Sequence, residues 1–232
     1  VGLLAVVVLE TSCVRCVRAP GAALASPSSG SEIRVITKAL RSDGALDATG
    51  RRRLARGIRE DATGLRGSLP RSTSPDESLA ALNAHVFGPG GFTALTDAAA
   101  PEGASIAATL RSRRGTCVTL AIVYLEFARR LGLEVHAVAA PDHVFVRVRL
   151  PEGPRNVELT EAGADLSDDL YRRRYRIHAD SIATGVFLRD LTDGELLAHL
   201  MVNQGVALSR ARNREAALAR YDQALAAAPQ LS

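Results

Sequence analysis

The sequence has no tryptophan, one methionine and an aromatic content of only 4%. This scarcity argues against a platform of aromatic rings that stacks nucleic-acid bases. Lysine is almost absent too: Lys38 is the only one, so arginine supplies nearly all of the 29 basic residues, and the formal charge is +4. Acidic residues lie close to the arginine clusters at 51–53 and 172–174. Such a mixture of charges is typical of solvated helix faces. We therefore predict no nucleic-acid partner.

Cysteine is also scarce, and three cysteines are too few for a disulfide framework. Cys13 and Cys16 form a C-x-x-C pair near the start of the chain, whereas Cys117 stands alone. A structural zinc site needs four ligands, and none of the five histidines has a spacing that would complete this pair. We predict no metal and no cofactor.

Long apolar runs are missing as well. Residues 1–9 are apolar but far short of the roughly 20 residues that span a bilayer, so we predict no membrane span. The run resembles the apolar part of a secretory signal without its basic start. Cleavage before Cys13 as in a lipoprotein, or after Ala25, would each be compatible with export, although Glu10 fits the first poorly. An extracytoplasmic location and a start without any targeting role both stay open.

The 232 residues, 47% of them hydrophobic, suffice for one ordinary domain with an appendage. Residues 1–32 read as a candidate signal remnant and a flexible linker rich in small residues. Residues 33–192 predict one α+β domain that begins with two short surface helices between 33 and 65. Residues 193–232 return to helical periodicity and predict a helical hairpin.

The most informative stretch lies between residues 115 and 160. From Thr116, apolar residues recur at steps of three and four until Gly132, which stands where a left-handed C-cap belongs. This pattern predicts a buried helix. Segments 134–140, 144–150 and 155–159 then read as strands, the second with strict alternation of apolar and polar residues. The order is therefore a helix followed by an antiparallel sheet.

Cys117 falls in the first turn of the predicted helix. Unpaired backbone N–H groups and the positive end of the helix dipole favour a thiolate there. A nucleophilic cysteine needs a base, and His143 begins a strand that can lie against the helix. The imidazole in turn needs a group that orients it. Asn156 and Glu158, two residues apart on one face of the next strand, are the candidates.

Four motifs carry a resemblance to a known superfamily. They are RGTCVTLA at 114–121, YLEFARRLGL at 124–133, PDHVFVR at 141–147 and NVELT at 156–160. Together they resemble the core of the transglutaminase-like superfamily, which has a papain-like fold and a Cys–His–acid triad. The likeness is closest to a bacterial branch in which this core is fused to tetratricopeptide repeats.

The resemblance implies that Cys117 is the nucleophile, His143 the base and Glu158 the acid. The superfamily usually has Asp-x-Thr at the last site, so Glu158 is one methylene longer than expected. The implied activity is cysteine-dependent acyl transfer, with hydrolysis of an amide bond in a peptide or protein substrate as our preferred form. Many members of the branch lack the cysteine, and a non-catalytic binding scaffold is the alternative.

The C-terminal hairpin resembles one tetratricopeptide unit. Six residues fall at repeat positions: Gly205, Leu208, Ala217, Tyr221, Ala224 and Pro229. Gln204 departs from the usual leucine. A single unit cannot bury its own apolar face, so it must pack on the catalytic domain, on a continuation of the repeat or on a protein partner.

The register of the last hairpin decides whether Glu158 can act on His143. A simple turn centred on residues 151–154 pairs positions whose numbers sum to 305, which sets Glu158 opposite Arg147. His143 would then lie about 13 Å away along the strand. We expect a bulge or a tighter turn that moves the sum towards 301. Without it, Asn156 or no third residue at all would complete the site.

Overall fold

The structure is a computed structural model that describes residues 35–44, 46–95 and 101–229. The C-x-x-C pair, the candidate signal and the linker lie outside these residues. No helix in the described part of the chain is long and apolar enough to cross a membrane.

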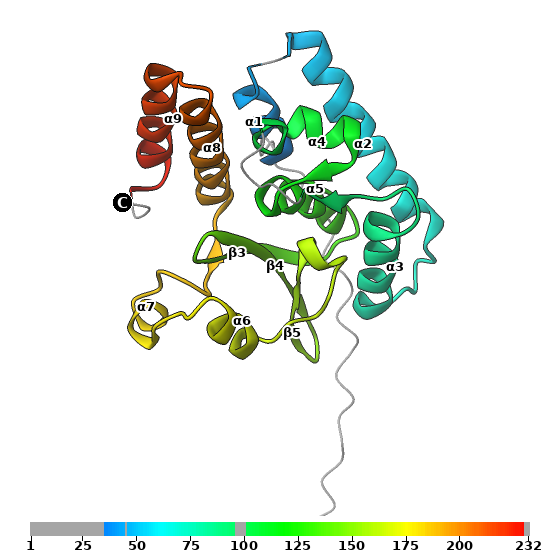
Figure 1. Cartoon of the computed structure of the whole chain (residues 1–232). Coiled ribbons are helices and arrows are strands. Elements are labelled where there is room, and N and C mark those ends of the chain that lie inside the picture. Colours follow the sequence, from blue (N-terminus) through cyan, green and yellow to red (C-terminus); the bar gives the residue numbers. More distant parts are fainter. Residues whose placement is uncertain (1–34, 45, 96–100, 230–232) are drawn as a thin grey trace, which may run out of the picture.

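Helices flank a small central sheet (Figure 1). The α-helices are α1 (Val35–Ser42), α2 (Ala48–Ser68), α3 (Pro75–Phe87), α4 (Ile106–Ser112), α5 (Cys117–Arg130), α6 (Asp168–Arg174), α7 (Ala179–Ala183), α8 (Asp193–Arg210) and α9 (Arg214–Ala227). Short 3-10 turns are η1 (Pro101–Ala104) and η2 (Leu159–Glu161). The strands are β1 (Thr93–Ala94), β2 (Arg114–Gly115), β3 (Glu134–Ala140), β4 (His143–Leu150), β5 (Gly153–Val157) and β6 (Asp190–Leu191).

The main sheet has the order β5-β4-β3-β6, with each neighbouring pair antiparallel. Alternation along β4 gives the sheet two faces. Val144, Val146 and Val148 belong to the main core, which α5 shares, whereas Phe145 packs with Tyr171 of α6 in a second cluster. The sheet thus lies between α5 and α6, as Figure 1 shows. The predicted order of a helix and then an antiparallel sheet is confirmed.

Helix α5 is the buried centre of the fold. Thr116 caps its start in a capping box with Thr119, and Gly132 follows its end with a φ of +81°. All residues from 118 to 128 are buried. Local capping signals and apolar periodicity therefore suffice to fix where this helix begins and ends.

The two N-terminal helices differ from the expected pair of short surface helices. Helix α1 buries four residues: Val35, Ile36, Ala39 and Leu40. Helix α2 runs for 21 residues and buries only Ala55, Ile58 and Ala62. The full length of α2 is hard to predict from the sequence, because arginine and other polar residues dominate this segment and its apolar stripe is narrow.

The C-terminal hairpin of α8 and α9 packs on the rest of the chain. Leu196 and Leu200 of α8 belong to the main core. The Gln204 amide donates to the carbonyl of Ala104 at 3.4 Å, and Arg220 of α9 donates to the carbonyl of Ser42 at 2.9 Å. A polar Gln204 therefore fits a contact with η1. That the hairpin is a tetratricopeptide unit, and that the domains divide at residue 192, stay predictions.

Close packing within this hairpin leads to a stability prediction. A Cβ atom on Gly205 would overlap the ring of Tyr221. We expect Gly205→Ala to lower the free energy of unfolding by about 1–3 kcal/mol through overpacking. Gly57→Ala, at an exposed position of α2 with open space around it, should instead raise it by about 0.5–1 kcal/mol. Urea denaturation of both variants makes the comparison, and equal effects would contradict the packing described.

Candidate active site

Cys117 is the first residue of α5, and its side chain is partly exposed. Hydroxyl groups fix this helix start. The Thr116 hydroxyl donates to the carbonyl of Gly103 at 3.1 Å, and the Thr119 hydroxyl accepts from the Thr116 N–H at 3.0 Å. A Cβ atom on Gly115 would lie 2.5 Å from the Thr119 oxygen, so only glycine fits there. The backbone before the thiol is therefore held closely.

His143 opens β4, directly after a turn in which Asp142 has a φ of +54°. Its side chain is 8% exposed, and its Nε2 lies 2.7 Å from Oε2 of Glu158. The Cys117 side chain lies close enough to the ring to contribute to the raised pKa of His143. Because Nε2 is engaged by Glu158, Nδ1 is the nitrogen left to face the thiol. The structure thus brings His143 into contact with Glu158 and places Cys117 within electrostatic range of the ring.

The Glu158 carboxylate is 1% exposed and fully hydrogen-bonded. Besides His143, its Oε2 accepts from the Tyr171 hydroxyl at 2.9 Å. Its Oε1 accepts from the N–H of Thr160 at 2.9 Å and from the Thr160 hydroxyl at 2.5 Å. Four donors offset the cost of burying this carboxylate.

The register explains how Glu158 reaches His143. Pairs between β4 and β5, such as Val146 with Val157, sum to 303, halfway between the simple hairpin and the shift we expected. The remaining reach comes from the chain leaving the ladder: β5 ends at Val157, and Glu158 forms a bridge with Ala164 and caps η2. A side chain at this corner is free to turn towards the start of β4.

Asn156, the other candidate for the third position, is held away from His143. Its amide oxygen accepts from Nε of Arg147 at 3.0 Å, and its amide nitrogen donates to Asp168 at 2.7 Å and to the carbonyl of Leu166. The side chain is therefore fully used in a network around the buried Arg147. The structure does not bring Asn156 to the imidazole.

Burial and mutual contact shift the pKa values of both His143 and Glu158. For His143, burial disfavours the charged ring, but hydrogen bonds with Cys117 and Glu158 and the negative charges of both outweigh it and raise its pKa to about 9. For Glu158, burial works against the charge, yet the contact with His143 and the Thr160 donors lower its pKa to about 2. The geometry therefore favours an imidazolium beside a carboxylate at neutral pH.

These shifts predict how stability depends on pH. A raised pKa of His143 stabilises the fold below its ordinary pKa of 6.5, and this contribution is lost as the pH rises through about 9. A lowered pKa of Glu158 stabilises the fold above its ordinary pKa of 4.5, and this contribution is lost as the pH falls towards about 2. The stability difference between wild type and Glu158→Gln in urea should therefore be largest between about pH 4.5 and 6.5. A difference that does not vary with pH would contradict the pairing.

Residues 52–201 match the family model described as the transglutaminase-like superfamily, which is more than half of the chain. The chain belongs to the transglutaminase-like superfamily. The match includes Cys117, His143 and Glu158 and runs into α8.

Relatives of this transglutaminase-like chain are distant. A protein named UPF0162 from Xylella fastidiosa strain 9a5c is 29% identical over 101 residues, which cover 43% of this chain and 36% of the relative. The UPF0162 protein of strain Temecula1 matches with the same identity and coverage. This chain thus spans about a third of the length of the curated relatives it matches. No solved structure matches it.

Aromatic rings that the sequence pattern did not indicate also lie at the candidate site. Tyr175 stacks on the imidazole of His143, with ring centroids 5.2 Å apart and planes inclined by 13°. Tyr171 stacks on Phe145 with centroids 3.8 Å apart. The available signal was the run YRRRY at 171–175, which places two of the four tyrosines one helical turn apart.

The described residues contain no group of three or more His, Cys, Asp or Glu side chains placed to hold a metal ion.

Proposed function

We propose that this transglutaminase-like chain is a cysteine-dependent enzyme that hydrolyses peptide or amide bonds. In this proposal Cys117 is the nucleophile, His143 the general acid and base, and Glu158 the group that orients the imidazole. The observation that carries it is the buried 2.7 Å contact between His143 and Glu158, which leaves the other ring nitrogen for the thiol at the start of α5.

Each step follows from these positions. The Cys117 thiolate attacks the carbonyl carbon and forms a tetrahedral intermediate. The protonated His143 gives its proton to the leaving nitrogen, the C–N bond breaks, and a thioester to Cys117 remains. A water molecule then attacks the thioester while His143 takes one of its protons. Collapse releases the carboxylic acid and restores the thiolate and the imidazolium.

The backbone N–H of Cys117 supports this chemistry. As the first helical residue it has no partner within α5. No hydrogen bond links it to another residue in the described part of the chain. It is therefore available to donate to the oxyanion of the tetrahedral intermediate.

Hydrolysis is preferred over transfer to an amine because the Cys117 side chain is partly exposed. Water can reach a thioester at such a position, and a dilute amine would compete only if the site excluded water. Transfer to an amine is therefore the second outcome of the same acyl-enzyme.

A substrate screen tests the proposal. Wild type and Cys117→Ala are incubated with a library of peptides and peptide amides in water enriched in oxygen-18, with and without added methylamine. We expect wild type alone to release products that carry the heavy oxygen at the new carboxylate. Methylamide products would instead indicate a cross-linking activity. Identical product spectra from wild type and Cys117→Ala across the library would contradict the proposal and favour a binding scaffold.

A further inference from the structure

Tyr171 is a buried tyrosine whose hydroxyl donates a hydrogen bond to a residue of the candidate triad. It is 0% exposed, and its hydroxyl donates to Oε2 of Glu158 at 2.9 Å. The same oxygen faces Nε2 of His143 at 2.7 Å. Tyr171 therefore contacts the one carboxylate atom on which the orientation of the imidazole depends.

We infer that Tyr171 is a positioning residue, which acts on His143 by fixing the Glu158 carboxylate; this inference rests on the proposed function. A glutamate has three side-chain torsions, and the Thr160 contacts restrain only Oε1. A second donor at Oε2 fixes the rotation of the carboxylate group about its last bond. Without that donor, only His143 itself holds Oε2 in place.

The phenol can act only as a donor in this place. Burial, and then the negative charge of Glu158 and the hydrogen bond to it, raise the pKa of Tyr171 far above its ordinary value. The hydroxyl therefore keeps its proton throughout the working pH range. A permanent donor to a carboxylate stabilises the charged form of that carboxylate.

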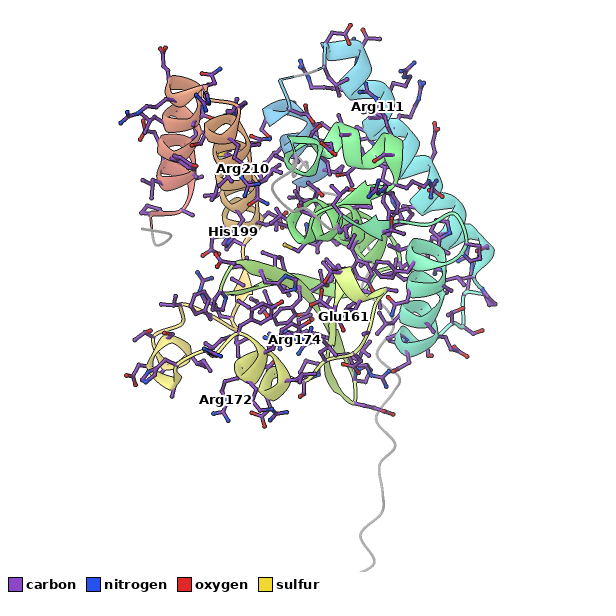
Figure 2. All side chains as sticks on the ribbon, viewed as in Figure 1. Arg111, Glu161, Arg172, Arg174, His199 and Arg210 are labelled. Carbon is purple, nitrogen blue, oxygen red and sulfur yellow. The ribbon has the colours of Figure 1, made fainter. Side chains whose placement is uncertain are left out.

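Tyr171 lies in a helix that contacts both β4 and η2. Its ring stacks on Phe145 of β4, two residues after His143, with planes inclined by 10°. Arg174, one turn further along α6, pairs with Glu161 at 2.5 Å, which joins this helix to η2 directly after Glu158. Figure 2 shows Glu161 and Arg174 labelled where η2 and α6 meet. Helix α6 thus holds the tyrosine against the two elements that carry His143 and Glu158.

The test compares Tyr171→Phe with Tyr124→Phe. Both remove one hydroxyl from a tyrosine that is 0% exposed, but the Tyr124 hydroxyl donates to Asn83 at 2.7 Å and does not contact the triad. Tyr171→Phe keeps the ring that stacks on Phe145. Two properties are measured: the pKa of Glu158 by carboxyl NMR, and the rate at which iodoacetamide labels Cys117 at neutral pH.

We expect Tyr171→Phe to raise the Glu158 pKa by about one unit, since one of its four donors is lost. The rate of Cys117 labelling at neutral pH should fall about threefold, and kcat should fall about tenfold with KM unchanged, because the imidazolium is held less firmly beside the thiol. Tyr124→Phe should leave all of these at the wild-type values.

Failure of this inference can be told apart from failure of the proposed function. If Glu158 has the same pKa in Tyr171→Phe as in wild type, or if Tyr124→Phe shifts the pKa of Glu158 equally, the positioning role of Tyr171 is overturned. If wild-type Cys117 labels like an ordinary thiol, the proposed function is overturned, and the catalytic meaning of Tyr171 with it. The Glu158 titration does not depend on turnover, so it reports on the hydrogen bond in either case.

Discussion

Replacing Cys117 with serine is expected to lower kcat/KM for amide hydrolysis by about 10⁴-fold or more. Serine nearly matches cysteine in size, but its hydroxyl does not ionise beside His143 at neutral pH, so the attacking anion is lost. Removing a nucleophile that acts as a unit with its base removes nearly all of the covalent catalysis. Initial rates on whichever peptide the substrate screen identifies provide the measurement.

Stability serves as the control for this variant. Because the side chain is partly exposed, Cys117→Ser should leave the free energy of unfolding within about 0.5 kcal/mol of wild type. Loss of activity in a folded protein then reports on chemistry. A Cys117→Ser enzyme that keeps a tenth or more of the wild-type rate would show that another group is the nucleophile.

The second large effect is expected for Glu158→Gln. The glutamine amide has the same shape as the carboxylate, but its NH₂ group cannot accept a hydrogen bond. The Glu158 carboxylate accepts from four donors, so the amide leaves some of these donors without an acceptor. The buried imidazolium of His143 also loses its counter-charge. We expect a loss of about 3 kcal/mol in the free energy of unfolding near pH 6, and a fall in kcat of about 10³-fold. The pKa of His143 should drop from about 9 towards its ordinary range.

Glu152→Gln is the matched control. Glu152 is an exposed acid in the turn between β4 and β5, six residues before Glu158. Its substitution should change stability by no more than about 0.5 kcal/mol and leave turnover unchanged. Comparable losses in both variants would mean that the effect of Glu158→Gln is one of general negative charge and not of the pair with His143.

Much of the site could be predicted from sequence because its signals are local. Thr116 and Gly132 cap α5, and the alternation along β4 assigns its two faces, so the positions of Cys117 and His143 follow from short-range patterns. The place of Glu158 does not follow from such short-range patterns. It depends on a two-residue turn and on where β5 leaves the ladder, and both are set by tertiary packing.

Helix α6 and the positions of Tyr171 and Tyr175 could not be predicted from the sequence for a different reason. This helix has seven residues and buries only Tyr171, so it has no apolar periodicity to detect. The arginines around Tyr171 and Tyr175 give the segment the composition of a solvated face. Only the folded structure brings Tyr171 against Phe145 and Tyr175 against His143, both residues of β4.

The most direct test of the account is the pH dependence of Cys117 labelling by iodoacetamide in wild type and in His143→Ala, followed by mass spectrometry of the intact chain. An ordinary thiol reacts with a midpoint near about 8.5. The account predicts that wild-type Cys117 is labelled at neutral pH at least about tenfold faster than Cys117 in His143→Ala, because the imidazolium that stabilises the thiolate is gone from the variant. Identical labelling rates for the two proteins at every pH would contradict it.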